Sequence, residues 1–218
     1  MAYFVLQIAG IILGGIGMIG TLAATFMPQW RVSAHIGGNI VVFETIWEGL
    51  WMACASQLGI RLQCKFYDTI LALSPPLEAI RALMCTAVVL SIISFLLAIV
   101  GVKYTRRNKD ISIFILAAGL SFLLTGILVL IPVSWTAGSI IHDFYDPKVP
   151  MPLKRDLGAA LYVGWVSSAL LIIAGAIYSI FWCWADASLK SKYPSLSCHS
   201  LRKPNVSGGP APSVHAYV

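Results

Sequence analysis

The stretch Trp47-Glu48-Gly49-Leu50-Trp51 decides the fold of this chain, together with two cysteines that follow it, Cys54 and Cys64. The stretch lies between two long apolar runs, so it faces water beside a membrane. The two cysteines enclose nine residues, among them Gly59, and this spacing suits a β-hairpin. A disulfide across so short a loop would remove roughly 3 kcal/mol of unfolded-chain entropy. The alternative is a pair of reduced cysteines, which the oxidising conditions outside the cell disfavour.

The residues around this stretch predict a small sheet. Residues 39–43 are mostly β-branched or aromatic and stand between two glycines and the tryptophan stretch, which is typical of a β-strand. Residues 66–73 carry apolar side chains at near-helical spacing until Ser74-Pro75-Pro76 interrupts them. We therefore expect strands first and then a short amphipathic helix beside the membrane.

The composition is that of an integral membrane protein, with 58% hydrophobic and 11% charged residues and a mean hydropathy of +0.83. Four runs without Lys, Arg, Asp or Glu are long enough to cross a bilayer as helices: residues 8–26, 82–102, 111–133 and 159–182. The predicted organisation is one membrane domain, residues 1–184, followed by a disordered cytoplasmic tail, residues 185–218. Within the membrane domain, residues 28–81 and 134–156 are predicted to be extracellular.

The formal charge of +6 does not indicate a nucleic-acid partner, because much of the cationic charge lies in two short segments. These segments are the turn between the second and third apolar runs and the tail, with Lys103, Arg106, Arg107, Lys109, Lys190, Lys192, Arg202 and Lys203. Positive residues are retained on the cytoplasmic side of a membrane. Both termini are therefore predicted to be cytoplasmic, and the tryptophan stretch extracellular.

The sequence does not indicate an enzyme, a cofactor or a metal site. Catalysis needs a nucleophile with a base, paired carboxylates in a cleft, or closely spaced metal ligands. The four histidines lie in four separate regions, at His35, His142, His199 and His215. We expect a protein without enzymatic activity.

Trp30, Gly49-Leu50-Trp51, Cys54 and Cys64 resemble the W…GLW…C…C signature of the claudins, tight-junction proteins with four membrane spans. Further runs are similar to claudin patterns in the same order, including Arg81-Ala82-Leu83-Met84, Pro132-Val133-Ser134-Trp135, Asp143-Phe144-Tyr145-Asp146-Pro147 and the terminal Tyr217-Val218. The resemblance implies an integral membrane α+β fold, a left-handed four-helix transmembrane bundle with a small extracellular antiparallel β-sheet. It places the protein in the plasma membrane at the tight junction.

The resemblance also implies a function. Claudins polymerise into strands, in cis and in trans, with themselves and with other claudins, and control paracellular permeability. The alternative is a claudin-like auxiliary subunit or a myelin-type tetraspan protein, which shares the signature and forms no strands. Arg81, the run Phe144-Tyr145-Asp146-Pro147 and the terminal Tyr217-Val218 favour a claudin proper.

By the same resemblance Lys65, which directly follows the second cysteine, lines the paracellular pore. Arg31 and Arg61 would reinforce a positive lining, and three acids could oppose it, namely Glu44, Glu48 and Asp68. Glu48 and Asp68 are expected to face elsewhere, which predicts a barrier to cations and an anion-selective pore. The alternative for Lys65 is an ordinary solvated lysine.

The resemblance implies further contacts with partners. Ile70 would insert into an aromatic pocket of a neighbouring molecule formed by Phe144 and Tyr145, or else pack within its own subunit. The end Tyr217-Val218 has the form that PDZ domains capture, which predicts scaffold proteins of the zonula occludens type as partners.

Two more residues are singled out by their chemistry. Cys183 lies near the end of the fourth apolar run, where a cysteine is accessible for S-acylation in contact with the lipid bilayer. Lys148 stands where claudins that receive clostridial enterotoxin carry an apolar residue, and an unpaired ammonium is costly to bury. Toxin binding is therefore predicted to be weak.

Overall fold

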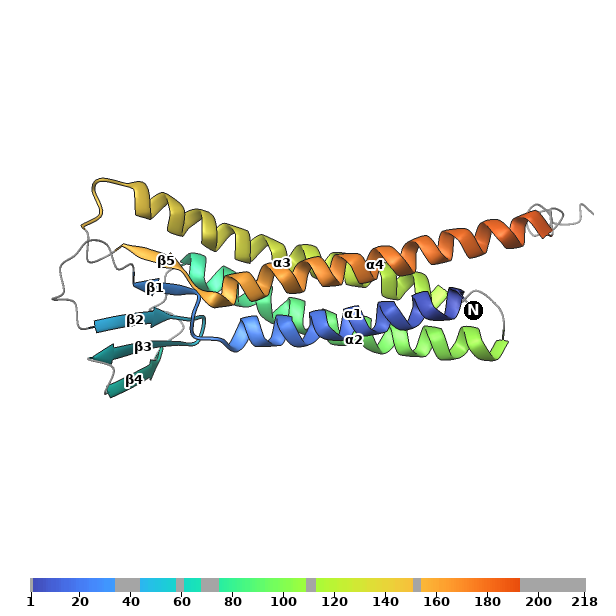
Figure 1. The fold of residues 1–218 in the computed structure, drawn as a ribbon, viewed down its shortest axis with the longest axis horizontal. Helices are drawn as coiled ribbons and strands as arrows, with labels where there is room; N and C mark the ends of the chain where they lie inside the picture. Colours follow the sequence, from blue (N-terminus) through green and yellow to red (C-terminus); the bar gives the residue numbers. More distant parts are fainter. Residues whose placement is uncertain are drawn as a thin grey trace, which may run out of the picture.

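The computed structural model describes residues 2–33, 44–57, 61–67, 75–108, 113–150 and 154–192. Four long helices lie lengthwise together, and a small sheet stands at one end of them (Figure 1). The helices are α1 (Ala2–Phe26), α2 (Pro75–Asn108), α3 (Ile113–Tyr145) and α4 (Ala159–Lys192). This arrangement confirms the predicted fold class. The N-terminal end of α1 and the C-terminal end of α4 both lie away from the sheet (Figure 1).

All four helices are long and apolar enough to cross a membrane. The outside of the bundle carries exposed apolar side chains, among them Ile12, Val89, Leu120 and Val166. A hydrocarbon surface of this kind suits contact with lipid, where each helix satisfies its backbone groups internally.

Small residues let the helices approach closely inside the bundle. A Cβ atom at Gly10 would lie 2.8 Å from Cζ of Tyr178, and one at Gly17 would lie 2.8 Å from Cγ of Leu171. The buried Tyr178 hydroxyl donates to the carbonyl oxygen of Gln7 at 3.0 Å, so it is satisfied within the bundle. Close contact and van der Waals packing of this kind are the usual basis of helix association in a membrane.

The helix bounds differ from the apolar runs at the end of the bundle that carries the sheet. Helix α3 continues past Val133, where the apolar run ends, as far as Tyr145, so residues 134–145 are helical rather than loop. Helix α2 begins already at Pro75, a residue type that suits the first turn because it lacks the amide hydrogen. Helix α3 thus continues through the uncharged residues 134–142 to Tyr145, and the length of the apolar run did not predict this end.

The sheet has five strands in the order β4-β3-β2-β1-β5, and each neighbouring pair is antiparallel. The strands are β1 (Arg31–Ser33), β2 (Glu44–Glu48), β3 (Met52–Gln57), β4 (Arg61–Phe66) and β5 (Arg155–Leu157). The predicted antiparallel sheet is confirmed. The strand expected at residues 39–43 lies outside the described residues, and β2 begins directly after it.

Two expectations around the hairpin have different outcomes. Cys54 of β3 and Cys64 of β4 are direct cross-strand partners and form a disulfide, as predicted. Phe66 is the last residue of β4 and not the start of the expected amphipathic helix. The rest of that expected helix, residues 68–73, lies outside the described part of the chain.

Candidate functional site at the sheet end of the bundle

Two tryptophans of the signature satisfy the end of helix α1. The last carbonyl groups of a helix have no partner within the helix. The indole N–H of Trp30 donates to the carbonyl oxygen of Ala24 at 2.8 Å, and that of Trp51 donates to Thr25 at 2.9 Å. Trp30 is only 2% exposed. The signature thus joins the sheet to α1 through one buried and one part-buried hydrogen bond.

Gly49 allows the chain to pass close to the end of the same helix. A Cβ atom at this position would lie 2.5 Å from the Cα atom of Pro28, a contact that only a backbone shift could relieve. The next residue, Leu50, is 1% exposed and belongs to the hydrophobic core. The glycine and the leucine of the signature are therefore explained by packing.

Arg81 ties the same stretch to helix α2. Its Nε atom donates to the carbonyl oxygen of Leu50 at 2.5 Å. Its guanidinium carbon lies 5.2 Å from the ring centres of both Trp51 and Tyr67, within the range of cation–π attraction. Trp30, Gly49, Leu50, Trp51 and Arg81 form one unit, the anchor, which fixes the sheet on α1 and α2.

Tyr67 remains a neutral hydroxyl beside the anchor. Burial raises the pKa of its phenol and the Glu48 carboxylate raises it further, while Arg81 and Arg31 lower it. The hydroxyl group donates to the carbonyl oxygen of Gly49 at 3.5 Å.

A row of paired residues crosses the sheet from β1 to β4. Arg31 pairs with Glu48, Glu48 with Ala53, and Ala53 with Lys65. Residues directly opposite each other on antiparallel strands project from the same face of a sheet. We call Arg31, Glu48, Ala53 and Lys65 the charge row. Lys65, one of the predicted pore charges, is exposed on β4, the edge strand of the sheet.

Glu48 and Arg31 of the charge row each contact a residue outside the row. The Arg155 guanidinium on β5 donates to the Glu48 carboxylate at 2.7 Å, and both side chains are largely shielded from solvent. Arg31 is half-buried, and its guanidinium donates to the Ser139 hydroxyl on α3 at 3.3 Å. The side chain of Arg61, the third predicted pore charge, lies outside what the structure describes.

Arg155 and Ser139 were missed by the sequence analysis. Both come from the segment between the third and fourth apolar runs, where three cations and three acids balance each other. Strand β5 has three residues, too few for a pattern to be visible, so no sequence signal could pair Arg155 with Glu48.

The residues predicted to contact partners are only partly described. Tyr145 is 78% exposed at the end of α3, and its ring packs edge-on against Phe144 with 5.5 Å between the ring centres. The Lys154 ammonium donates to the Phe144 carbonyl oxygen at 2.7 Å. Cys183 is exposed in the C-terminal half of α4. Ile70, Tyr217 and Val218 lie outside the described residues.

The fold and the anchor define a four-helix membrane protein with a disulfide-closed sheet at one end. The chain belongs to the PMP-22/EMP/MP20/Claudin family, whose model matches residues 4–178. It is 55% identical to Claudin-17 of Sus scrofa over 199 residues, which cover 89% of this chain and 88% of the relative. It is 49% identical to Claudin-8 of Mus musculus over 220 residues, with 99% and 98% covered. Claudin-4 of Homo sapiens is 46% identical over 180 residues, with 81% and 86% covered.

Proposed function

We propose that this chain is a tight-junction claudin that polymerises into strands and forms a barrier to cations, with anion-selective character where a pore opens. Family membership over most of the chain supports the claudin part of this proposal and makes the protein a structural molecule rather than an enzyme. The position of Lys65 carries the proposal of selectivity.

The charges and the disulfide indicate how the protein is oriented in the membrane. We infer that the sheet end lies outside the cell, because Cys54 and Cys64 are paired there and disulfides persist under oxidising conditions. Lys103 lies near the far end of α2, followed in sequence by further cations, as expected for the cytoplasmic side. Both termini would then be cytoplasmic.

Lys65 is a suitable charge for ion selection because it is exposed and its backbone is fixed. It follows Cys64, whose disulfide to β3 holds the strand in register. A unit charge about 4 Å from an ion contributes roughly 1 kcal/mol in bulk water, and several times more in a narrow passage of lower dielectric. Arg31 stands in the same row but is half-buried, so we assign it a weaker part in the lining.

The test is Lys65→Glu in an epithelial monolayer, with sodium and chloride dilution potentials measured at low and moderate salt. Reversal of the charge should shift the permeability ratio toward sodium, and the shift should shrink as salt is added. Lys148→Glu is the matched control, because it makes the same change at an exposed position on another segment. An unchanged ratio in Lys65→Glu at both salt concentrations would remove Lys65 from the pore.

Polymerisation into tight-junction strands separates a claudin from the auxiliary-subunit or myelin-type alternative. Freeze-fracture imaging of transfected cells that lack tight-junction strands of their own should show continuous strands. The same assay tests side-by-side contact of Ile70 with Phe144 and Tyr145 of a neighbour: continuous strands formed by Ile70→Glu protein would exclude that contact. The exposed ring of Tyr145 supports it.

Three further partner proposals rest on single residues. Deletion of Val218 should abolish binding to PDZ scaffolds, because the terminal carboxylate and apolar side chain are what such domains capture. Cys183 should be S-acylated, since it is exposed at the membrane boundary. Clostridial enterotoxin should bind weakly because of Lys148, and nanomolar binding to the unaltered protein would refute this.

A further inference from the structure

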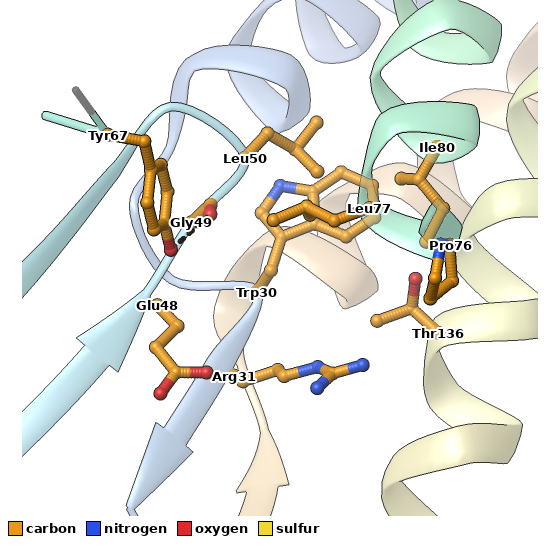
Figure 2. Close-up of a pocket in the computed structure, with 10 residues that line it drawn as sticks. All are labelled: Trp30, Arg31, Glu48, Gly49, Leu50, Tyr67, Pro76, Leu77, Ile80 and Thr136. Atoms are coloured by element: carbon orange, nitrogen blue, oxygen red, sulfur yellow. Dashed lines mark hydrogen bonds between the residues drawn. The ribbon is translucent and has the colours of Figure 1, made fainter. Parts of the chain in front are cut away.

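A cavity of about 140 Å³ lies between the sheet, the first turns of helix α2 and Thr136 of helix α3 (Figure 2). Its apolar wall is formed by Trp30, Leu50, Leu77 and Ile80. The polar wall consists of side chains from the sheet and its flanking loop, with Arg31, Glu48 and Tyr67 among them. A single cavity thus offers an apolar surface on one side and charged or hydrogen-bonding groups on the other.

The Arg31 guanidinium in this cavity has N–H donors that can bind a ligand. A guanidinium carries five N–H donors in a planar fork. Within the part of the chain that the structure describes, its one side-chain hydrogen bond is the 3.3 Å contact with Ser139. Figure 2 shows the Arg31 side chain extending from the sheet toward the helix that carries Thr136. A half-buried cation with so few partners favours an anionic one.

The other charges around the cavity do not supply that anion. The Glu48 carboxylate accepts from Arg155 at 2.7 Å, and no ion pair joins it to Arg31 among the described residues. Arg31, Glu48 and Arg155 together carry one net positive charge. Tyr67 contributes a neutral hydroxyl, because burial raises the pKa of its phenol. The site therefore suits an anion and disfavours a cation, and the single fork of Arg31 matches one carboxylate.

We propose that this cavity binds a small organic monocarboxylate with a compact apolar body, a single ring or a short branched chain. The carboxylate lies in the plane of the Arg31 guanidinium and accepts two parallel hydrogen bonds. The apolar body rests on Trp30, Leu77 and Ile80. The volume is close to that of an engineered protein cavity of about 150 Å³ that accepts benzene. The ligand would fill the space between the sheet and the bundle.

The test uses the full-length protein in detergent, with benzoate as the probe and binding measured by calorimetry and saturation-transfer NMR. Benzylammonium and benzyl alcohol are the controls, because they keep the ring and replace the negative charge by a positive or a neutral group. Octanoate tests whether a long acyl chain competes. Chloride at equal ionic strength tests whether the anion alone suffices. We expect saturable binding of benzoate only, and no competition by chloride or by octanoate.

Two variants locate the binding. Arg31→Gln should weaken benzoate binding by about tenfold or more, the usual cost of losing a charge-assisted pair. Leu77→Trp should abolish it by filling the cavity while Arg31 stays in place. Lys148→Gln removes an exposed cation from the same end of the molecule and should leave binding unchanged. Equal binding to wild type and Leu77→Trp, equal binding of the three ring probes, or absence of saturable binding would overturn the proposal.

Discussion

Replacing Arg155 with Gln should lower the preference of the assembled protein for anions, although Arg155 lies far from Lys65 in the sequence. The Arg155 guanidinium lies 2.7 Å from the Glu48 carboxylate, and the two side chains are only 18% and 31% exposed, so their charges largely cancel. The variant leaves the charge of Glu48 uncompensated in the charge row that ends at Lys65.

The register gives the size of the effect. Glu48 and Lys65 are separated by two strand spacings, roughly 10 Å. At this distance one charge acts on an ion beside Lys65 with about 0.4 kcal/mol in bulk water and about 1.7 kcal/mol at an effective dielectric constant of 20. Physiological salt reduces both values to roughly a third. Because sodium and chloride shift in opposite directions, the chloride-to-sodium permeability ratio should fall by about 1.5- to 7-fold.

The assay is again the dilution potential across a monolayer, with a complete set of four proteins. Glu48→Gln should raise the chloride-to-sodium ratio, because it leaves Arg155 unpaired. The double variant Glu48→Gln with Arg155→Gln should return close to the wild type, and all differences should grow at low salt. If Arg155→Gln and the double variant lower the ratio equally, the effect is structural and the electrostatic reasoning is wrong.

Three further predictions concern the fold. Surface protein should contain Cys54 and Cys64 oxidised to each other, and mass spectrometry that finds both thiols free would contradict the structure. Gly158→Ala should lower the unfolding temperature in detergent, because the added methyl group would overlap the carbonyl oxygen of Gln29; Gly138→Ala is the control, since nothing lies within 4 Å of its Cβ position. Trp30→Phe should lower the free energy of unfolding by about 1–3 kcal/mol, because it leaves the buried carbonyl oxygen of Ala24 without its donor. Chemical unfolding measures this change. An unchanged free energy of unfolding would show that this hydrogen bond does not hold the sheet.

The bundle was predictable because a membrane imposes a simple rule on sequence. A helix that crosses it needs about twenty apolar residues without charge, and four such runs stand out without any knowledge of packing. The hairpin was predictable for a similar reason, since Cys54 and Cys64 stand at a spacing that a short loop closes directly. Both signals are local, and each lies within one element or one pair of elements.

Other features of the structure were not predicted from the sequence, and the pairing of strands among them depends on contacts between distant segments. Residues 134–145 continue helix α3 beyond the apolar run as far as Tyr145. Asp146 and Pro147 follow directly and are a helix stop signal, but a prediction based on the length of the apolar run did not use it. The pairing of β5 with β1 joins residues more than a hundred positions apart, and three residues are too few to reveal it. The register of the sheet, which places Glu48 and Lys65 in one row, likewise depends on pairing between strands that the sequence does not reveal.

The anchor fixes the position of the charge row through a series of rigid contacts. The indole groups of Trp30 and Trp51 fix the sheet on the last turn of α1, and the disulfide then fixes β4 on β3. Lys65 lies on β4 at the edge of the sheet, and these contacts fix the position of its backbone. Coulomb energy falls with distance, and a charge on a mobile loop would average its effect over many positions. In the proposed function, the signature residues would therefore contribute to selectivity without touching an ion, because they keep the backbone of Lys65 in a constant place.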